Sequence, residues 1–248
     1  MSAKHILLLT ATIQPRAGQP SLAVTDPAVR LQEYETALAF YAGLLQRGAL
    51  HAIVFAENSG FDLGPLAARF PVAGIEWISA PDLDYPLGYH RGYGEFRLVD
   101  AAMQRSTHIR EAGADARVWK VSGRYIVSNL GRVLRWAPRR FDFYCAMKKG
   151  WAEMSALAWS PEGYRHAIEG IWRSFDSAMP PELILYQRFE LPPSARLRVV
   201  RSFNWPPFIV GRRGSDGSSF EGRFTRYRHG LTLAGRLATL PLRQLFNA

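Results

Sequence analysis

Three segments near the N-terminus set the fold class of this chain. Residues 6–12 form a short apolar run that leads into a loop containing proline and glycine, which indicates a buried strand. Asp26-Pro27 supplies a helix N-cap and a first-turn proline, and apolar residues at three- and four-residue spacing predict a helix over about 27–47. Residues 51–55 predict a second strand. Strand, helix and strand in this order imply a right-handed parallel crossover.

The rest of the chain continues this alternation. We expect further strands at 76–79, 118–121, 141–147 and about 156–159. We expect helices after Gly94, after Ser160-Pro161 and from Pro180-Pro181 to Phe189. The order predicts a single α/β domain at 1–210 with a mostly parallel central sheet, followed at 211–248 by a flexible loop and a basic, partly amphipathic extension.

Charge and cysteine content narrow the function classes. Residues 196–248 hold ten arginines against Asp216 and Glu221, so most of the net charge of +10 lies there. Such a segment suits nucleic acid, anionic lipid or a phosphorylated substrate. Cys145 is the only cysteine, which excludes an internal disulfide and a cysteine-rich zinc site. With no apolar run long enough to span a bilayer and no recognisable signal peptide at the start, we expect a cytoplasmic protein.

Polar residues follow four of the predicted strands. Ligands of open α/β sheets bind beyond the carboxyl ends of the strands, so these residues are the candidate site. In chain order they are Thr10, Ala11, Thr12, then Glu57, Asn58, Ser59, then Asp82, Asp84, then Lys120, Ser122, Gly123, Arg124 and Tyr125. The first two sets suit a base and a ribose, although each set alone fits loop capping equally well. Arg30 is a further candidate ligand, with a surface pair to Asp26 as the alternative.

Gly92-Tyr93-Gly94-Glu95 precedes a predicted helix and adds a second feature. The free N–H groups and the dipole of that helix suit a phosphate, and Glu95 suits sugar hydroxyls. The alternative is an ordinary helix whose first turn carries a dipole-matched acid. The chain contains neither GxxxxGK[ST] nor GxGxxG, which disfavours a P-loop ATPase and a dinucleotide-binding Rossmann domain.

Lys120 and Arg124 carry the most specific signal because they lie beside a glycine that breaks a predicted strand. A lysine and an arginine fork can neutralise the charge of a departing diphosphate and so replace a metal ion. The structural alternative is that both side chains point to solvent from one side of an ordinary strand. Asp82-x-Asp84 offers a second option, in which paired carboxylates hold Mg²⁺ or Mn²⁺. As catalytic proton acceptors we expect Asp84, Glu95 and Asp82 before Glu182, which fits better as a first-turn helix acid.

These motifs, in their order and spacing, carry a resemblance. They are Thr10-Ala11-Thr12, Asp26 with Arg30 and Tyr34, Glu57-Asn58-Ser59-Gly60, Gly92-Tyr93-Gly94-Glu95 and Lys120-Val121-Ser122-Gly123-Arg124-Tyr125. Over about residues 5–130 the chain resembles small bacterial glycosyltransferases of capsular polysaccharide and lipopolysaccharide assembly.

The resemblance implies a GT-A-like Rossmann-type fold with a nucleotide-sugar half at about 1–130 and an acceptor half at about 131–210. It further implies a nucleotide-sugar donor and transfer to a glycan or lipid-linked acceptor at the inner face of the cell membrane. It does not supply a DxD metal site where one is expected, so a mechanism without a required cofactor is our first expectation.

Two rival functions stay open. The basic C-terminal region suits nucleic-acid binding, with stacking groups at Trp205, Phe208, Phe220 and Tyr227. A nucleic-acid function would give the polar strand ends no role, so we expect no nucleic-acid partner. A sugar nucleotidyltransferase shares the fold but usually has a glycine-rich, basic first loop, whereas residues 14–20 hold only one arginine and one glycine. The arginines and leucines of 223–248 suit either a peripheral membrane contact or docking on the domain.

Overall fold

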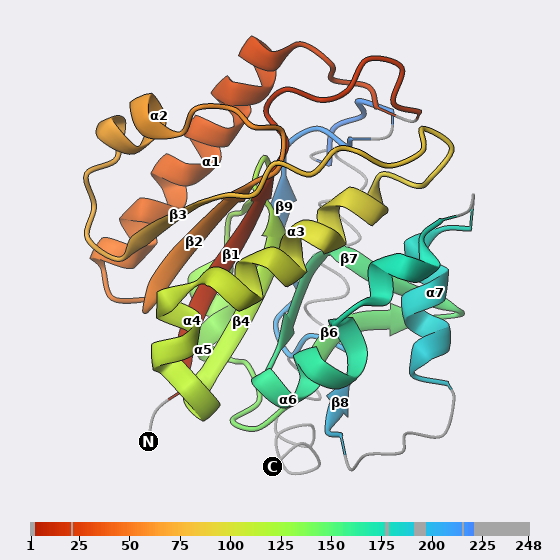
Figure 1. The fold of residues 1–248 in the computed structure, drawn as a ribbon. Coiled ribbons are helices and arrows are strands. Elements are labelled where there is room, and N and C mark those ends of the chain that lie inside the picture. Colours follow the sequence, from red (N-terminus) through yellow and green to blue (C-terminus); the bar gives the residue numbers. More distant parts are fainter. Residues whose placement is uncertain (1–2, 21, 177–178, 191–196, 215, 221–248) are drawn as a thin grey trace.

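The structure is a computed structural model that describes residues 3–20, 22–176, 179–190, 197–214 and 216–220. It contains a seven-stranded sheet with helices on both faces (Figure 1). The strands lie in the order β3 (Ile75–Ser79), β2 (Ala52–Glu57), β1 (Lys4–Ala11), β4 (Ala116–Ser122), β7 (Trp151–Trp159), β6 (Phe143–Lys148) and β8 (Val199–Val200). A separate antiparallel pair is formed by β5 (Ile126–Val127) and β9 (Ile209–Val210).

The first half of the sheet has the Rossmann-type arrangement. Strands β1, β2, β3 and β4 run parallel, and the crossover from β1 to β2 passes through α1 (Pro27–Gln46). Only β7 runs against its neighbours in the sheet, because β6 and β7 form a hairpin whose turn residues, Lys149 and Gly150, have φ values of 52° and 80°. The prediction of one α/β domain with a mostly parallel central sheet is confirmed, and the topology fits a GT-A-like fold.

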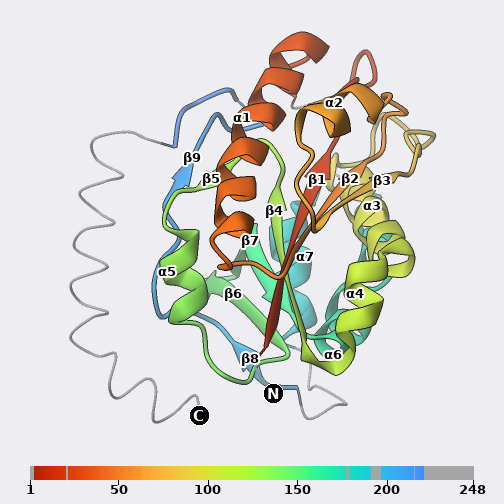
Figure 2. The same cartoon turned by 90° about the vertical axis from the view of Figure 1, so that its left-hand side faces the viewer.

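The helices divide between the two faces of the sheet, as Figure 2 shows from the side. On one face lie α1, α2 (Gly64–Arg69) and α5 (Leu130–Arg135). The other face is covered by α3 (Gly92–Arg105), α4 (Thr107–Ala112), α6 (Pro161–Gly163) and α7 (Pro181–Arg188), with short helical turns at Gly113–Asp115, Tyr164–Ile168 and Ile171–Ser174. Because both faces are covered, alternate residues of β1 enter two separate cores, and the middle of the strand, residues 6–9, is apolar on both sides.

Local signals place most of the elements where the sequence predicts them. Asp26 caps α1 through a 2.8 Å hydrogen bond that its carboxylate accepts from Ala28 N–H, and Ser160 caps α6 in the same manner. The helix expected after Gly94 is interrupted, however. Ser106 has an extended backbone and caps α4, so α3 ends one residue earlier. Strand β7 begins at Trp151, five residues before the expected strand at 156, and α2 was not predicted.

No helix among the described residues is both long and apolar enough to cross a bilayer.

Candidate functional site

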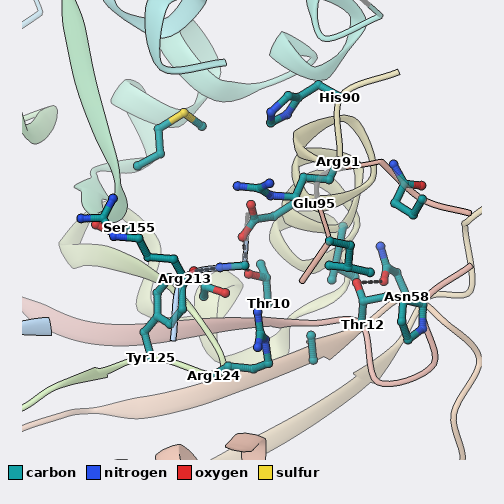
Figure 3. Close-up of a pocket in the computed structure, with 18 of the residues that line it drawn as sticks. Thr10, Thr12, Asn58, His90, Arg91, Glu95, Arg124, Tyr125, Ser155 and Arg213 are labelled. Atoms are coloured by element: carbon teal, nitrogen blue, oxygen red, sulfur yellow. Dashed lines mark hydrogen bonds between the residues drawn. The ribbon is translucent and has the colours of Figure 1, made fainter. Parts of the chain in front are cut away.

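A pocket of about 460 Å³ opens beyond the carboxyl ends of β1 and β4 (Figure 3). The expected edge of the sheet is therefore where the cavity lies. Of the strand-end residues, Arg30 and the Gly92–Glu95 motif, ten residues line the pocket: Thr10, Ala11, Thr12, Arg30, Asn58, Glu95, Lys120, Ser122, Arg124 and Tyr125. Thr10 and Tyr125, the first and last of these residues, are 115 positions apart in the sequence. The parallel pairing of β1 and β4 brings their segments to the same edge of the sheet.

Lys120 and Glu95 form an ion pair in the wall of the pocket. Lys120 Nζ lies 2.6 Å from Glu95 Oε1, and Thr10 Oγ1 donates a 2.8 Å hydrogen bond to the same oxygen. Lys120 is an inner residue of β4 and its side chain is only 2% exposed, whereas that of Glu95 is 30% exposed. Burial raises the pKa of Glu95, but the Lys120 charge and the hydrogen bonds from Lys120 and Thr10 outweigh burial and hold the pKa below its usual value.

Arg124 also has a carboxylate partner. Its Nη1 lies 2.5 Å from Glu33 Oε2 on α1, and Arg212 Nη2 lies 2.6 Å from the other oxygen of the same carboxylate. Both cations expected to meet a diphosphate are thus partly neutralised by the chain itself. A bound anion would have to share or displace these carboxylates.

Glu57 and Ser59 hold a loop together and do not line the pocket. The fully buried Glu57 carboxylate accepts hydrogen bonds from the backbone N–H groups of Ile13, Ser59, Gly60 and Phe61 and from the Ser59 hydroxyl. Ser59 Oγ in turn accepts from Gln14 N–H at 3.0 Å. The two residues tie the loop after β2 to the loop after β1, which is the loop-capping alternative raised by the sequence.

The glycines of the expected phosphate loop serve close packing. A Cβ on Gly94 would lie 2.6 Å from the Tyr85 hydroxyl, and one on Gly92 would lie 2.9 Å from Pro181. Neither glycine lines the pocket, and nor does Tyr93, which packs against the rings of Tyr85, Tyr89 and Trp172.

The N–H groups at the start of α3 are also in use. Gly92 N–H donates to His90 Nδ1, Tyr93 N–H donates to the His90 carbonyl, and Glu95 N–H donates to the Arg91 carbonyl. The phosphate site expected at this helix terminus therefore lacks these donors. Gly123, also expected to bind the donor, instead packs against the Thr10 carbonyl and the Tyr34 ring, which a Cβ would meet at 2.9 and 3.1 Å.

Asp82 and Asp84 lie outside the pocket. Leu83 and Tyr85 line the pocket, whereas Asp82 forms a 2.6 Å ion pair with Arg97 and Asp84 is exposed. Their expected roles as proton acceptors or metal ligands therefore find no support in this placement. In the part of the chain that the structure describes, no group of three or more His, Cys, Asp or Glu side chains could hold a metal ion.

Three arginines that the sequence did not assign to the site complete its positive wall. Arg16 comes from the loop after β1, Arg91 from the residue before α3, and Arg213 from the segment expected to be a flexible loop. With Arg30, Lys120 and Arg124 they bring six cationic side chains to the pocket, against the three carboxylates of Glu95, Glu153 and Glu182. Arg91 directly precedes the Gly92 motif, but no local pattern marks Arg16 or Arg213.

Contacts with the domain fix Arg213 at the pocket. Gly214 N–H donates to the Tyr125 hydroxyl at 3.1 Å, and the Gly214 carbonyl accepts from Ala23 N–H at 2.9 Å. The Phe220 ring lies 5.1 Å from the Tyr125 ring, and the Arg213 guanidinium lies 4.7 Å from the Phe220 centroid. Arg213, Gly214 and Phe220 therefore form part of the cavity wall. Because Phe220 is packed against Tyr125 and Arg213, it is not a free stacking group of the kind that the nucleic-acid alternative expects.

His90 lines the pocket as a neutral side chain. Burial, followed by the charge of Arg91, lowers the pKa of His90 to about 4. Because Nδ1 accepts the hydrogen bond from Gly92 N–H, the proton of neutral His90 is on Nε2, which leaves a ring donor for a ligand.

The expected C-terminal extension is described only up to residue 220, so the arginine- and leucine-rich tail and Tyr227 lie outside the described residues. Trp205, another proposed stacking group, is partly buried, with Arg132 over its ring at 5.5 Å. Phe208 is also partly buried.

Comparison with known proteins gives only distant structural likeness. No family model and no curated protein matches the sequence. One similar solved structure is of a protein assigned as a nucleotide-diphospho-sugar transferase from Desulfovibrio desulfuricans G20, with 15% identity, 81% of this chain and 79% of that chain covered, and a TM-score of 0.49. Another is 4-diphosphocytidyl-2C-methyl-D-erythritol synthase, with 10% identity, 94% and 99% coverage and a TM-score of 0.44. The chemistry of the pocket therefore carries the assignment of function.

Proposed function

We propose that this protein is a glycosyltransferase that binds a nucleoside-diphosphate sugar in this pocket and transfers the sugar to a glycan or lipid-linked acceptor. The observation that supports it is the convergence of six cationic side chains with hydroxyl and amide groups at the carboxyl edge of parallel strands. A nucleoside diphosphate needs this combination, because its phosphates require positive charge and its base and ribose require polar partners.

Polar groups lie at both ends of the pocket, and at one of them Arg30 Nε donates a 2.6 Å hydrogen bond to the Thr12 carbonyl. Thr12 and Asn58, joined by a 2.6 Å hydrogen bond, lie at one end, and Arg124 and Arg213 lie toward the other (Figure 3). In this proposal the nucleoside occupies the first end and the diphosphate the second. Arginine and lysine side chains would then stabilise the negative charge of the leaving diphosphate without a metal ion.

A sugar nucleotidyltransferase is the second candidate, and Arg16 favours it. This arginine brings a cation from the loop after β1 into the pocket. It is held there by hydrogen bonds to the carbonyls of Leu83 and Tyr85. A nucleoside triphosphate carries more charge than a nucleoside diphosphate, and six cations could accommodate it.

A thermal-shift panel of UDP-, GDP-, CMP- and dTDP-sugars, with and without Mn²⁺, tests nucleotide binding, because a ligand of the native state raises its stability. The proposal expects at least one UDP-, GDP- or dTDP-sugar to raise Tm without Mn²⁺, and the CMP-sugars, which carry a single phosphate, serve as the comparison. Product analysis then separates the two enzymes. Release of nucleoside diphosphate from the sugar nucleotide supports the glycosyltransferase, and release of pyrophosphate from a nucleoside triphosphate and a sugar 1-phosphate supports the rival. No Tm change with any nucleotide contradicts both.

The acceptor class and a place in cell-surface polysaccharide or lipopolysaccharide assembly rest on the sequence resemblance alone. Contact of the C-terminal tail with an anionic membrane rests on the arginines and leucines of residues 223–248, and a vesicle-binding assay on the full chain with and without these residues tests it.

A further inference from the structure

Trp151 is an exposed indole at the rim of the pocket. It is the first residue of β7, directly after the Lys149-Gly150 turn, and 45% of its surface is exposed. The other phenyl and phenol rings of the lining are engaged: Tyr34 and Tyr85 are buried, and Tyr125 and Phe220 pack on each other. A flat apolar surface next to polar groups is the kind of platform on which the apolar face of a pyranose ring stacks.

Two carboxylates accompany this indole. Glu153 lies two residues further along β7, and Glu182 lies in the first turn of α7, which packs against β7 (Figure 1). Glu153 accepts hydrogen bonds from the backbone and hydroxyl groups of Ser155. Ser155 itself lines the pocket at the end opposite Asn58 (Figure 3).

Glu182 differs from the other acidic candidates in its electrostatic surroundings. Glu95 is paired with Lys120 and Asp82 with Arg97, whereas no ion pair within the described residues includes Glu182. Burial raises the pKa of Glu182, Arg91 lowers it, and Glu153 and Glu95 raise it again, so the net shift is upward. A carboxylate with a raised pKa accepts a proton more readily than an ordinary one.

Glu162 provides an internal comparison. Both glutamates occupy the second position of a helix, after Pro161 in α6 and after Pro181 in α7. Glu162 pairs with Arg165 and His166 at the surface and does not line the pocket, whereas Glu182 does. The helix dipole accounts for an acid at this position in both helices, but it does not account for an acid facing a cavity.

We propose that Trp151, Glu153 and Glu182 form an acceptor subsite, in which the indole stacks on a saccharide ring and Glu182 takes the proton of the attacking hydroxyl. This inference rests on the proposed glycosyltransferase function. The acceptor oxygen forms a bond to the anomeric carbon of the donor while the bond from that carbon to the diphosphate oxygen breaks. Its electron pair leaves with the nucleoside diphosphate, the hydroxyl proton moves to the Glu182 carboxylate and then to solvent, and the anomeric configuration is inverted.

The test uses the full chain, the sugar nucleotide that gives the largest Tm shift, and octyl β-D-glucopyranoside and octyl β-D-galactopyranoside as acceptor probes. Mass spectrometry follows the gain of one sugar unit, and calorimetry follows donor binding. Trp151→Ala should raise KM for the glycoside about tenfold, the equivalent of one aromatic contact, while Trp151→Phe keeps most of the affinity. The donor dissociation constant should stay within about twofold of the wild-type value, a change of less than about 0.5 kcal/mol in binding free energy.

Glu182→Gln should lower kcat about 10²- to 10³-fold and abolish the acid limb of the pH profile, as expected when a general base is lost. Donor binding and thermal stability should be retained, and Glu162→Gln should leave all of these quantities unchanged. Glu182→Asp, which keeps the carboxylate, should recover part of the rate.

Three results overturn the inference: a donor-binding enzyme that transfers to neither glycoside, a Glu182→Gln variant that keeps its acid limb, and equal rate losses in the Glu182→Gln and Glu162→Gln variants. A different result, the absence of binding by any sugar nucleotide, refutes the proposed function itself. Retention of the anomeric configuration in the product would also overturn the assignment of Glu182, because the displacement described here inverts it.

Discussion

Lys120 Nζ lies 2.6 Å from Glu95 Oε1, so the lysine expected to meet a diphosphate and the acid expected to serve as base are partners in one ion pair. The pairing keeps the pKa of Glu95 low, which makes it a weak proton acceptor. It also offsets the charge of a lysine that is only 2% exposed. In the proposed reaction another acid of the pocket therefore serves as the base.

The two partners of this pair should respond unequally to substitution. Glu95→Gln leaves the buried Lys120 ammonium without a counter-charge and should lower the free energy of unfolding by about 2 kcal/mol. Lys120→Met should cost about 1 kcal/mol, because water reaches the partly exposed Glu95. Urea denaturation of both variants and of the double variant measures the difference.

The double-variant cycle provides the control for this prediction. The pair predicts that the combined loss is smaller than the sum of the single losses by about 1 kcal/mol. Additive losses would show that Lys120 and Glu95 are not energetically coupled.

Gly123 should not tolerate a side chain. Gly123→Ala places a Cβ 2.9 Å from the Thr10 carbonyl oxygen and 3.1 Å from the Tyr34 ring, and this overpacking should cost about 1–3 kcal/mol of stability. Gly131→Ala in α5 is the matched control, since its Cβ would meet Leu44 at an ordinary 3.9 Å and alanine favours the helix by about 1 kcal/mol. Similar changes in Tm for the two variants would contradict the close packing of Gly123.

Acid should destabilise the fold through two histidines. Burial, and after it a neighbouring arginine, lowers the pKa of both His5 and His90 to about 4. In the unfolded chain a histidine titrates near 6.5, so below about pH 6.5 the unfolded state binds more protons than the folded state. Stability should therefore fall as the pH drops from about 6.5 to 4.

The ring signals in NMR spectra test this prediction directly. His5 accepts a 3.0 Å hydrogen bond from Trp119 Nε1, which protonation of His5 Nδ1 would break. Midpoints near 4 for both rings are expected. A midpoint near 6.5 for either ring would remove that histidine from the explanation of acid sensitivity.

Glu33 should control the wall of the pocket that carries Arg213. Its carboxylate joins Arg124 to Arg212, next to the segment that packs against Tyr125. Glu33→Gln should therefore speed hydrogen exchange at Arg213 and Gly217, whose N–H groups bond to backbone carbonyls of this segment. The matched variant Glu35→Gln, on the same helix but paired with Arg69, should leave these rates unchanged.

The fold could be predicted further than the site. Periodicity and capping at Asp26 and Ser160 fix most elements, because those signals are local. The β6–β7 pairing and the break at Ser106 depend on a turn and a cap that apolar periodicity does not reveal. Strand ends locate the pocket, but they do not say which polar side chains are already engaged with one another.

Glu57 and Glu95 illustrate that limit. In sequence both are acids near a predicted strand end or helix start. In the structure the Glu57 carboxylate accepts hydrogen bonds from loop donors on both oxygens, and one oxygen of Glu95 is engaged by a lysine and a threonine. Arg213 illustrates the opposite case, since its place in the pocket depends on contacts with Tyr125 and Ala23, which are far away in sequence. Such partners follow from tertiary contacts, and no local pattern encodes them.

Calorimetric titration of the full chain with UDP, GDP, CDP and dTDP tests the central claim most directly, because it measures whether this cationic pocket binds a nucleoside diphosphate. We predict saturable one-site binding of at least one of these nucleotides. Arg213→Gln should weaken it about tenfold, the loss of one charge-assisted contact, while Arg165→Gln, outside the pocket, should leave it unchanged. Absence of binding, or equal affinities in wild type and both variants, would contradict the account.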